Sequence, residues 1–127
     1  MPASPVSHVA TVVALMAGAA AAQPAFLTAP QAPCGLAPQG VAIGDLDADG
    51  DLDVVTVEID VPLSGATGKV SVLLNTGGGV LAAPATYSVG TTSLKGVALL
   101  DLSGDGRPEV LVTNQWEGRL HILNNLG

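Results

Sequence analysis

Residues 40–57, GVAIGDLDADGDLDVVTV, hold an acidic loop between two short apolar runs. The runs at 41–44 and 54–58 are rich in Val and Ile, which favour β-strands. The loop carries five aspartates on alternate residues and one glycine at its sixth place; the aspartates are Asp45, Asp47, Asp49, Asp51 and Asp53. This stretch therefore predicts a β-hairpin with a highly charged connection.

The crowding of these carboxylates indicates a cation site. Two carboxylates about 5 Å apart repel by about 3 kcal/mol at an effective dielectric constant of about 20, so four that converge oppose closure by up to about 20 kcal/mol, or several-fold less where water screens them. The loop either opens into solvent or closes on a hard cation, and flexible all-oxygen ligation is typical of Ca²⁺. We predict ligands from the side chains of Asp45, Asp47, Asp49 and Asp53 and from the carbonyl of Asp51.

The second half of the chain repeats this pattern. The segment 96–113 (GVALLDLSGDGRPEVLVT) aligns with 40–57, and eight positions are identical. Further on, 118–125 (GRLHILNN) aligns with 68–75 (GKVSVLLN), so the connection between the matching segments is shorter in the second copy. A repeat of this length is typical of a solenoid or a propeller.

The second copy has an acidic loop of its own. Its predicted Ca²⁺ ligands, the fourth through its carbonyl, are Asp101, Ser103, Asp105, Arg107 and Glu109. Three carboxylates and a hydroxyl replace four carboxylates, so we expect weaker binding than in the first loop. Neither loop is an EF-hand, because position 12 is Thr56 or Val112 rather than glutamate. Asp-Gly loops also serve as ordinary turns, but two in register favour two calcium ions.

Composition and the remaining runs narrow the fold class. The runs at 70–74 and 85–89 are further strand candidates, and the glycines at 77–79 indicate a flexible turn rather than a phosphate cradle, because neither Lys-Ser/Thr nor a helix follows. Phe26, Tyr87 and Trp116 are the full aromatic set of the chain. A core of small aliphatic residues suits thin β layers, and we expect an all-β protein.

Charge and cysteine content exclude other classes. The net charge is −7 with only four basic residues, which speaks against nucleic-acid binding. Cys34 is the single cysteine, so an intrachain disulfide cannot form. We interpret it as an unpaired thiol in a linker.

The N-terminal region resembles an export signal. Residues 1–44 contain no Asp, Glu, Lys or Arg, and 9–22 form an uncharged apolar run that ends in small residues. This run is too short to span a bilayer, which needs about 20 residues, and it predicts a signal peptide at 1–22 despite the missing basic residues. A disordered Ala/Pro-rich leader is the alternative. Residues 23–37 form a Pro/Ala-rich linker, and we expect a secreted, cell-surface or periplasmic protein without a membrane span after cleavage.

The loop and strand pattern resembles the FG-GAP repeats of the VCBS type. The shared pattern is apolar-Ala-apolar-x-Asp-Leu-x-x-Asp-Gly-x-x-Asp/Glu-apolar, followed by a Val/Leu strand and an Asn-Gly-type turn. The resemblance implies β-propeller blades whose hairpin loops bind Ca²⁺ through the two ligand sets named above. The chain departs from the family where Leu46 and Leu102 replace a common Phe, and where Glu109 replaces Asp.

The resemblance implies two partial propeller blades, a first repeat at 38–95 and an incomplete second repeat at 96–127. Propellers close with about four to eight blades, so two blades leave open edges and half-covered apolar faces. We expect a fragment of a longer chain with additional blades or a protomer that self-associates, and the isolated chain to be oligomeric or poorly folded.

The expected function is that of a secreted calcium-binding module with a structural, adhesive or ligand-binding role. Its partner would be an unknown protein or carbohydrate, and Trp116 with Glu117 is the only hint of a ligand surface. The alternative is a fragment or accessory propeller part of a secreted enzyme that acts on polysaccharide or peptide. The residues argue against catalysis, because clustered loop carboxylates would stay ionised and Gly-x-Ser-x-Gly is absent.

Overall fold

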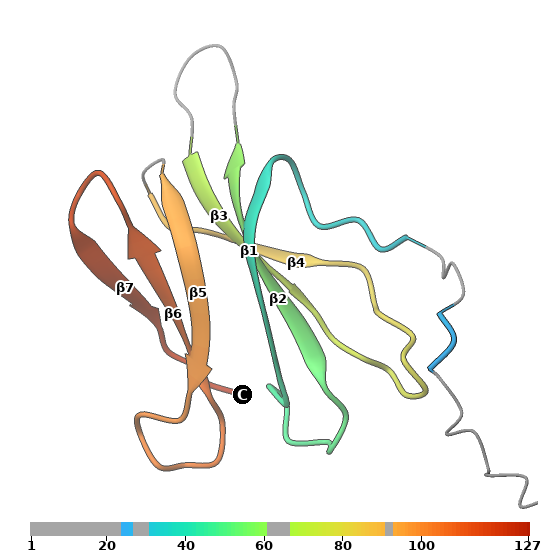
Figure 1. The fold of residues 1–127 in the computed structure, drawn as a ribbon. Helices are drawn as coiled ribbons and strands as arrows, with labels where there is room; N and C mark the ends of the chain where they lie inside the picture. Colours follow the sequence, from blue (N-terminus) through green and yellow to red (C-terminus); the bar gives the residue numbers. More distant parts are fainter. Residues whose placement is uncertain (1–23, 27–30, 61–66, 91–92) are drawn as a thin grey trace, which may run out of the picture.

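The computed structural model describes residues 24–26, 31–60, 67–90 and 93–127 (Figure 1). These residues form strands and loops only, which confirms the predicted all-β class. The strands in them are β1 (Pro38–Gly44), β2 (Asp53–Asp60), β3 (Thr67–Leu73), β4 (Ala85–Ser88), β5 (Leu94–Leu100), β6 (Glu109–Asn114) and β7 (Arg119–Leu123).

The strands agree with the apolar runs of the sequence and extend beyond most of them. β1 begins at Pro38, ahead of the run at 41–44, and β3 begins at Thr67, ahead of the run at 70–74. The predicted signal segment 1–22 lies outside the described residues, as do linker residues 23 and 27–30. The described residues include no helix with the length and apolar character needed to cross a membrane.

The strands form two antiparallel sheets. Sheet 1 has the order β1-β2-β3-β4 and sheet 2 the order β5-β6-β7. Their registers correspond: Val41 pairs with Thr56, and the equivalent residues of the second repeat, Val97 and Val112, pair in the same way. Both sheets also have an irregularity near the start of their first strand. The pairs of β2 with β3 and of β6 with β7 correspond as well, once β7 is aligned with β3 as in the sequence.

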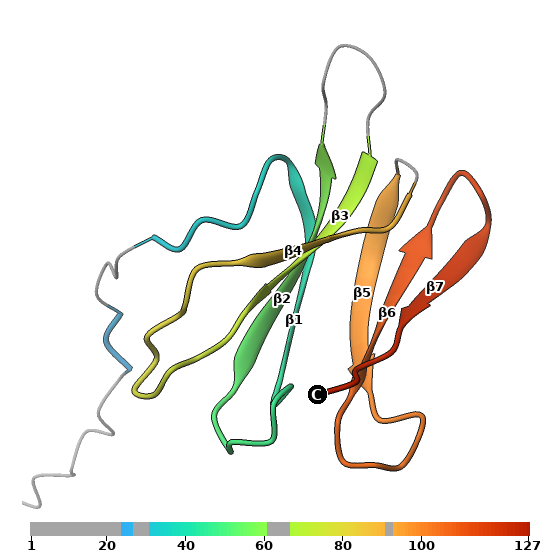
Figure 2. The same ribbon diagram turned by 180° about the vertical axis from the view of Figure 1, so that it is seen from behind.

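The two sheets meet through β1 and β5, which lie side by side in both views (Figure 1, Figure 2). Because side chains alternate across a strand, each sheet has an inner face toward the other sheet and an outer face. The inner face of sheet 1 carries Ala42, Val55, Val57, Val70 and Val72, and that of sheet 2 carries Val97, Leu99, Val110, Val112 and Leu123. Most of these residues, with Leu46 and Leu94, form the core.

Two glycines of β1 let the sheets approach. A Cβ atom at Gly44 would lie 2.9 Å from Cδ1 of Leu99, and one at Gly40 would lie 3.0 Å from the carbonyl oxygen of Lys95. Both distances are shorter than ordinary van der Waals contact, so larger residues would push β5 away. The sequence identified these glycines only as strand boundaries or repeat positions.

Away from β1 and β5 the sheets diverge and border an open-sided cavity of about 450 Å³. Its apolar lining comes from both sheets and includes Val72, Leu74, Tyr87, Val110 and Leu123. Arg107 and the C-terminal residues 124–127 also line it. The lack of large aromatic side chains explains why the interior of this wedge is only partly filled.

Candidate metal centre

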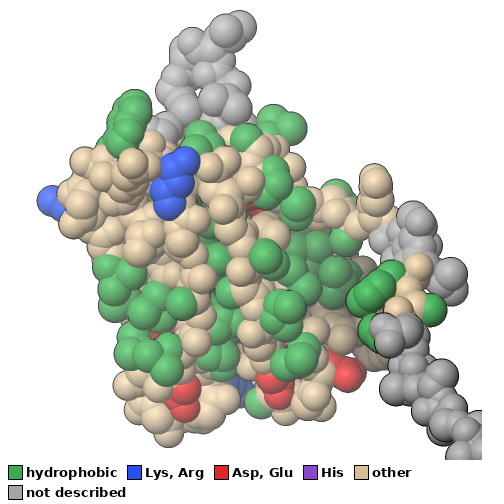
Figure 3. Space-filling view, viewed as in Figure 1, with side chains coloured by type: hydrophobic (Ala, Val, Ile, Leu, Met, Phe, Trp, Pro, Cys, Tyr) green, Lys and Arg blue, Asp and Glu red, His purple; other side chains and the backbone are tan. Residues whose placement is uncertain are grey.

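The two acidic loops lie at the same end of the molecule. The first loop, residues 45–52, joins β1 to β2, and the second loop, residues 101–108, joins β5 to β6, at the lower end in Figure 1. Figure 3 shows acidic side chains gathered at this end. The strands that lead into the two loops, β1 and β5, are neighbours, and Asn125 donates to a carbonyl of each loop.

The loops have the same backbone turn. Gly50 and Gly106 have φ angles of 93° and 87°, a region that favours glycine. Two positions earlier, Ala48 and Gly104 have φ angles of 64° and 76°. Alanine in this region is sterically strained, so the first loop keeps this turn against a local cost that the second loop avoids.

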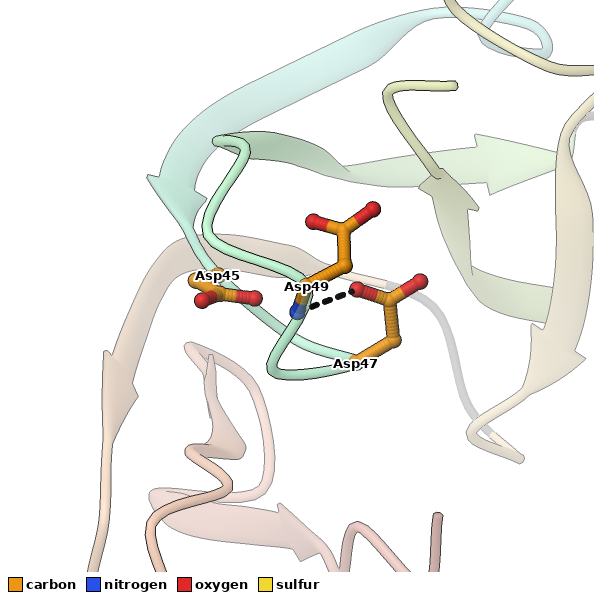
Figure 4. A group of neighbouring side chains, drawn as sticks. All are labelled: Asp45, Asp47 and Asp49. Carbon is orange, nitrogen blue, oxygen red and sulfur yellow. Dashed lines mark hydrogen bonds between the residues drawn. The ribbon is translucent and has the colours of Figure 1, made fainter. Parts of the chain in front are cut away.

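The first loop brings three of its aspartates together. Asp45, Asp47 and Asp49 each offer a carboxylate oxygen, and the three oxygens lie within 4.8 Å of one another (Figure 4). Asp47 also accepts the backbone N–H of Asp49 at 3.3 Å, and Asp49 accepts that of Asp51 at 2.8 Å. These hydrogen bonds orient the carboxylates, and the cluster contains positions 1, 3 and 5 of the predicted site.

Asp45 has one oxygen that the protein does not satisfy. Its Oδ2 accepts the backbone N–H of Gly50 at 3.0 Å, whereas its Oδ1 is buried and has no hydrogen-bond partner among the described residues. Leaving a charged acceptor buried without a partner is costly. The residues therefore fit a hard cation, which would be bound by this oxygen together with those of Asp47 and Asp49.

Local electrostatics also show the crowding in the first loop. The pKa of Asp47 is raised above its ordinary value, chiefly by loss of hydration and then by the negative charge of Asp49. The charges of Asp53 and Asp45 act in the same direction, and the hydrogen bond from the Asp49 backbone opposes them. A nearby positive ion would reverse this balance.

The second loop is organised differently. Oδ1 of Asp101, the counterpart of the unpartnered oxygen, accepts the backbone N–H groups of Gly104 at 2.7 Å and Asp105 at 3.2 Å, and Ser103 Oγ lies 3.4 Å away. Oδ2 accepts the backbone N–H of Gly106 at 2.9 Å. The pKa of Asp101 is lowered, most of all by the Gly106 bond. Backbone N–H groups of the second loop thus stabilise the negative charge of Asp101. In the first loop, Oδ1 of Asp45 has no such donor within the part of the chain that the structure describes.

The two residues predicted at position 9 lie at the base of their loops. Asp53 is fully buried, and Glu109 is almost so. Asp53 Oδ2 accepts the backbone N–H of Leu46 at 2.8 Å, and Glu109 Oε2 accepts that of Leu102 at 2.6 Å. These carboxylates close the hairpins, and neither belongs to the cluster of three aspartates.

The residues predicted to act through their carbonyls lie at equivalent places. The backbone N–H of Asp51 donates to Asp49, and that of Arg107 donates to Asp105 at 2.9 Å. In the second loop Asp105 and Ser103 are exposed. Within the described part of the chain, the second loop forms no group of three potential metal-binding side chains.

Sequence reasoning assigned no role to two asparagines that tie the loops to the sheets. Asn75 Nδ2 donates to the carbonyl of Leu52 at 3.2 Å, and Asn125 Nδ2 donates to that of Pro108 at 3.3 Å. Asn125 Nδ2 also donates to the carbonyl of Leu46, at 2.8 Å, and so joins the second sheet to the first loop. The signal that could have found them is that the two asparagines align with each other at the ends of the matching segments.

Trp116 and Glu117, the two residues that hinted at a ligand surface, lie in the turn between β6 and β7 and not in either acidic loop. Trp116 is largely exposed in the turn before β7, and Oε2 of Glu117 lies 3.3 Å from Nε2 of His121. The chain matches no protein-family model, no curated protein and no solved structure, so the resemblance to FG-GAP repeats rests on the residues of its own loops and strands.

Proposed function

We propose that the chain is a secreted calcium-binding β-repeat module of the propeller type, with a structural, adhesive or ligand-binding role. The observation that carries the calcium proposal is the buried, unpartnered Oδ1 of Asp45 beside two further carboxylates. Oxygen-only donors in a flexible loop suit Ca²⁺ better than a transition metal.

The role of the ion would be to stabilise the hairpin. When bound, Ca²⁺ supplies positive charge that offsets the repulsion among Asp45, Asp47 and Asp49. The protein itself holds these carboxylates in place through the N–H groups of Gly50 and Asp51. An ion that binds the folded but not the unfolded chain stabilises the fold by about 2.7 kcal/mol at a concentration of about 100 times its Kd.

The two loops should differ in affinity. The backbone N–H groups of Gly104 and Asp105 already occupy the Asp101 oxygen that corresponds to the open oxygen of Asp45. A cation in the second loop would compete with these donors, and it would find fewer carboxylates. We therefore assign the tighter site to the first loop and the weaker site to the second.

A thermal melt with and without Ca²⁺ tests the proposal. Extracellular calcium modules have affinities of about 10⁻⁴ to 10⁻³ M, so we expect Tm to rise in millimolar Ca²⁺ and to fall back in chelator. Asp45→Asn should abolish most of the rise, because the amide keeps the Gly50 contact but loses the charge. The matched Asp101→Asn variant should keep most of it. An unchanged wild-type Tm would reject calcium binding in both loops.

Export is a separate part of the proposal and rests on the apolar run at 9–22. We expect the chain, expressed in a bacterial host, to be recovered outside the cytoplasm with Gln23 as its first residue. N-terminal sequencing of the recovered protein checks this. Retention of the uncleaved chain inside the cell would reject export and leave the calcium proposal standing.

A further inference from the structure

Apolar side chains are exposed on the outer face of sheet 2 and on the β1 part of the outer face of sheet 1. The equivalent side chains of the other repeat lie in the core between the sheets. The outer face of sheet 2 carries Leu120 and Ile122, the counterparts of Val70 and Val72 on the inner face of sheet 1. Val70 is 0% exposed, whereas Leu120 is 54% exposed. Equivalent residues of the two repeats are thus buried in sheet 1 and exposed to solvent in sheet 2.

The outer face of sheet 1 shows the complementary relationship. Val41 and Ile43 are exposed there, and their counterparts Val97 and Leu99 pack into the core between the sheets. The rest of this face, on β2 and β3, is already covered: Thr56, Ser71 and Leu73 are buried, and residues 34 and 35 contact it near Thr56 and Glu58. The open part of the outer face of sheet 1 is therefore its β1 edge. Figure 3 shows that hydrophobic side chains reach the surface over both sheets.

The contact between the sheets also includes a hydrogen bond from Asn125, and the equivalent residue Asn75 has no corresponding bond to another repeat within the described part of the chain. Asn125 Nδ2 uses both of its hydrogens, one on Pro108 of its own repeat and one on Leu46 of the preceding repeat. Asn75 Nδ2 donates to Leu52 alone among the described residues, so its second hydrogen is available. The acceptor that corresponds to Leu46 is the carbonyl of Leu102, in an exposed loop.

We propose that the outer face of sheet 2 binds the outer face of sheet 1 of a second copy of this chain. The second copy would place Val41 and Ile43 on the face that carries Leu120 and Ile122, as Val97 and Leu99 pack within the chain on the core cluster that contains Val70. Asn75 of the second copy, which follows β3 in the seated sheet, would donate its second hydrogen to the carbonyl of Leu102 in the first copy, as Asn125 donates to Leu46 within the chain. We infer that a second copy of this chain binds there because the equivalent faces of sheet 1 and sheet 2 already pack together within one molecule.

One substitution between the repeats makes the contact between copies looser than the contact within the chain. Leu100 stands where sheet 1 has Gly44, whose missing side chain lets Leu99 approach. Gly96 stands where sheet 1 has Gly40, so close approach is kept at that end of the strand. We therefore expect reversible, concentration-dependent association that separates on dilution.

The proposed contact joins two different faces, so it is heterologous. Such contacts build rings when the rotation closes and open filaments when it does not. Each copy would keep one free face of each kind until a ring forms. The proposed contact therefore differs from an ordinary twofold dimer, in which both copies use the same face.

Sedimentation equilibrium of the purified chain and of two variants tests this heterologous contact. Ile43→Lys blocks the outer face of sheet 1, and Ile122→Lys blocks that of sheet 2. We expect wild type to form species of at least two copies, and each variant alone to associate at least tenfold more weakly. An equimolar mixture of the variants should form a dimer, because each supplies the face that the other has lost.

The control is Val80→Lys, which charges an exposed valine in the turn after β3 and should leave association unchanged. If a lysine variant loses its β-type circular dichroism, Val41→Thr and Leu120→Thr replace the pair, since threonine keeps strand propensity.

A monomeric wild type would overturn the proposal and leave the faces to another chain. A mixture that stays monomeric, or single variants that associate like wild type, would overturn it as well. Each sample is measured at saturating Ca²⁺ and again in chelator. Sedimentation reports mass, so the absence of association would reject this proposal without affecting the calcium-dependent rise in Tm.

Discussion

The backbone N–H of Leu46 donates to the carboxylate of Asp53 at 2.8 Å and closes the first acidic loop. The other oxygen of Asp53 accepts the backbone N–H of Asn75 at 2.8 Å, so one carboxylate fixes the loop and the end of β3 together. In the second loop, the backbone N–H of Leu102 donates to Glu109 as that of Leu46 does to Asp53. The last carboxylate of each loop therefore supports the hairpin whether or not an ion is bound.

Asp53→Asn should destabilise the protein without calcium. The backbone N–H groups of Leu46 and Asn75 would have one side-chain oxygen left between them. The new amide NH₂ would face the other N–H group, so two donors would meet. We expect the free energy of unfolding to fall by about 1–3 kcal/mol, measured by urea denaturation in chelator. Asp49→Asn is the control, because its remaining oxygen can still accept the N–H of Asp51; equal losses in both variants would contradict the assigned role.

Ala48→Gly should stabilise the first loop. The φ angle of 64° is strained for alanine and ordinary for glycine, and relief of this strain contributes about 1 kcal/mol. Gly104→Ala, the reverse change at the equivalent place of the second loop, should destabilise by a similar amount. Urea denaturation in chelator measures both. Changes of the same sign in the two variants would show that the loops do not share this turn.

The pH dependence of stability should differ between Asp101 and Asp47 when calcium is absent. The folded-state pKa of Asp101 is lowered, so its stabilising contribution is present above the unfolded-state pKa and is lost as pH falls through the folded value. The folded-state pKa of Asp47 is raised, so its contribution is present below the unfolded-state pKa and is lost as pH rises through the folded value.

Substitutions separate the two effects. Asp47→Asn should raise Tm at neutral pH in chelator, because it removes a carboxylate that its neighbours disfavour. Asp101→Asn should lower Tm at neutral pH and reduce the loss on acidification. Melts between about pH 2 and 7, which spans the aspartate range, measure both. A lower Tm for Asp47→Asn in chelator would contradict the repulsion on which the cation site is argued.

The strands and the loops were predictable from the sequence because both are local features. Alternating Val and Ile runs bounded by Asp and Gly specify hairpins within one short segment of chain, and the hairpins of β1–β2 and β5–β6 form as expected. The gathering of Asp45, Asp47 and Asp49 follows from their spacing in one turn. The boundaries of β1 and β3 were underestimated because pairing with β2 extends them past their apolar residues.

Features that depend on contact between distant segments could not be predicted in the same way. The structural place of Asp53 depends on Asn75 at the far end of β3, and the bond from Asn125 reaches back to Leu46 in the other repeat. The difference between the loops at Asp45 and Asp101 depends on where the backbone N–H groups of the second loop point. Composition and spacing carry no information about these directions.

Asn125→Asp should separate the two sheets. The change replaces an amide that donates to the carbonyls of Leu46 and Pro108 with a carboxylate that both carbonyls repel. Because the group is partly buried, we expect a loss of about 2–4 kcal/mol, measured by urea denaturation at saturating calcium. Asn124→Asp, at an exposed neighbouring position, adds the same charge and should cost little. If the two variants lose the same stability, net charge rather than the bond between the sheets accounts for the effect, and the second sheet is held to the first by its apolar core alone.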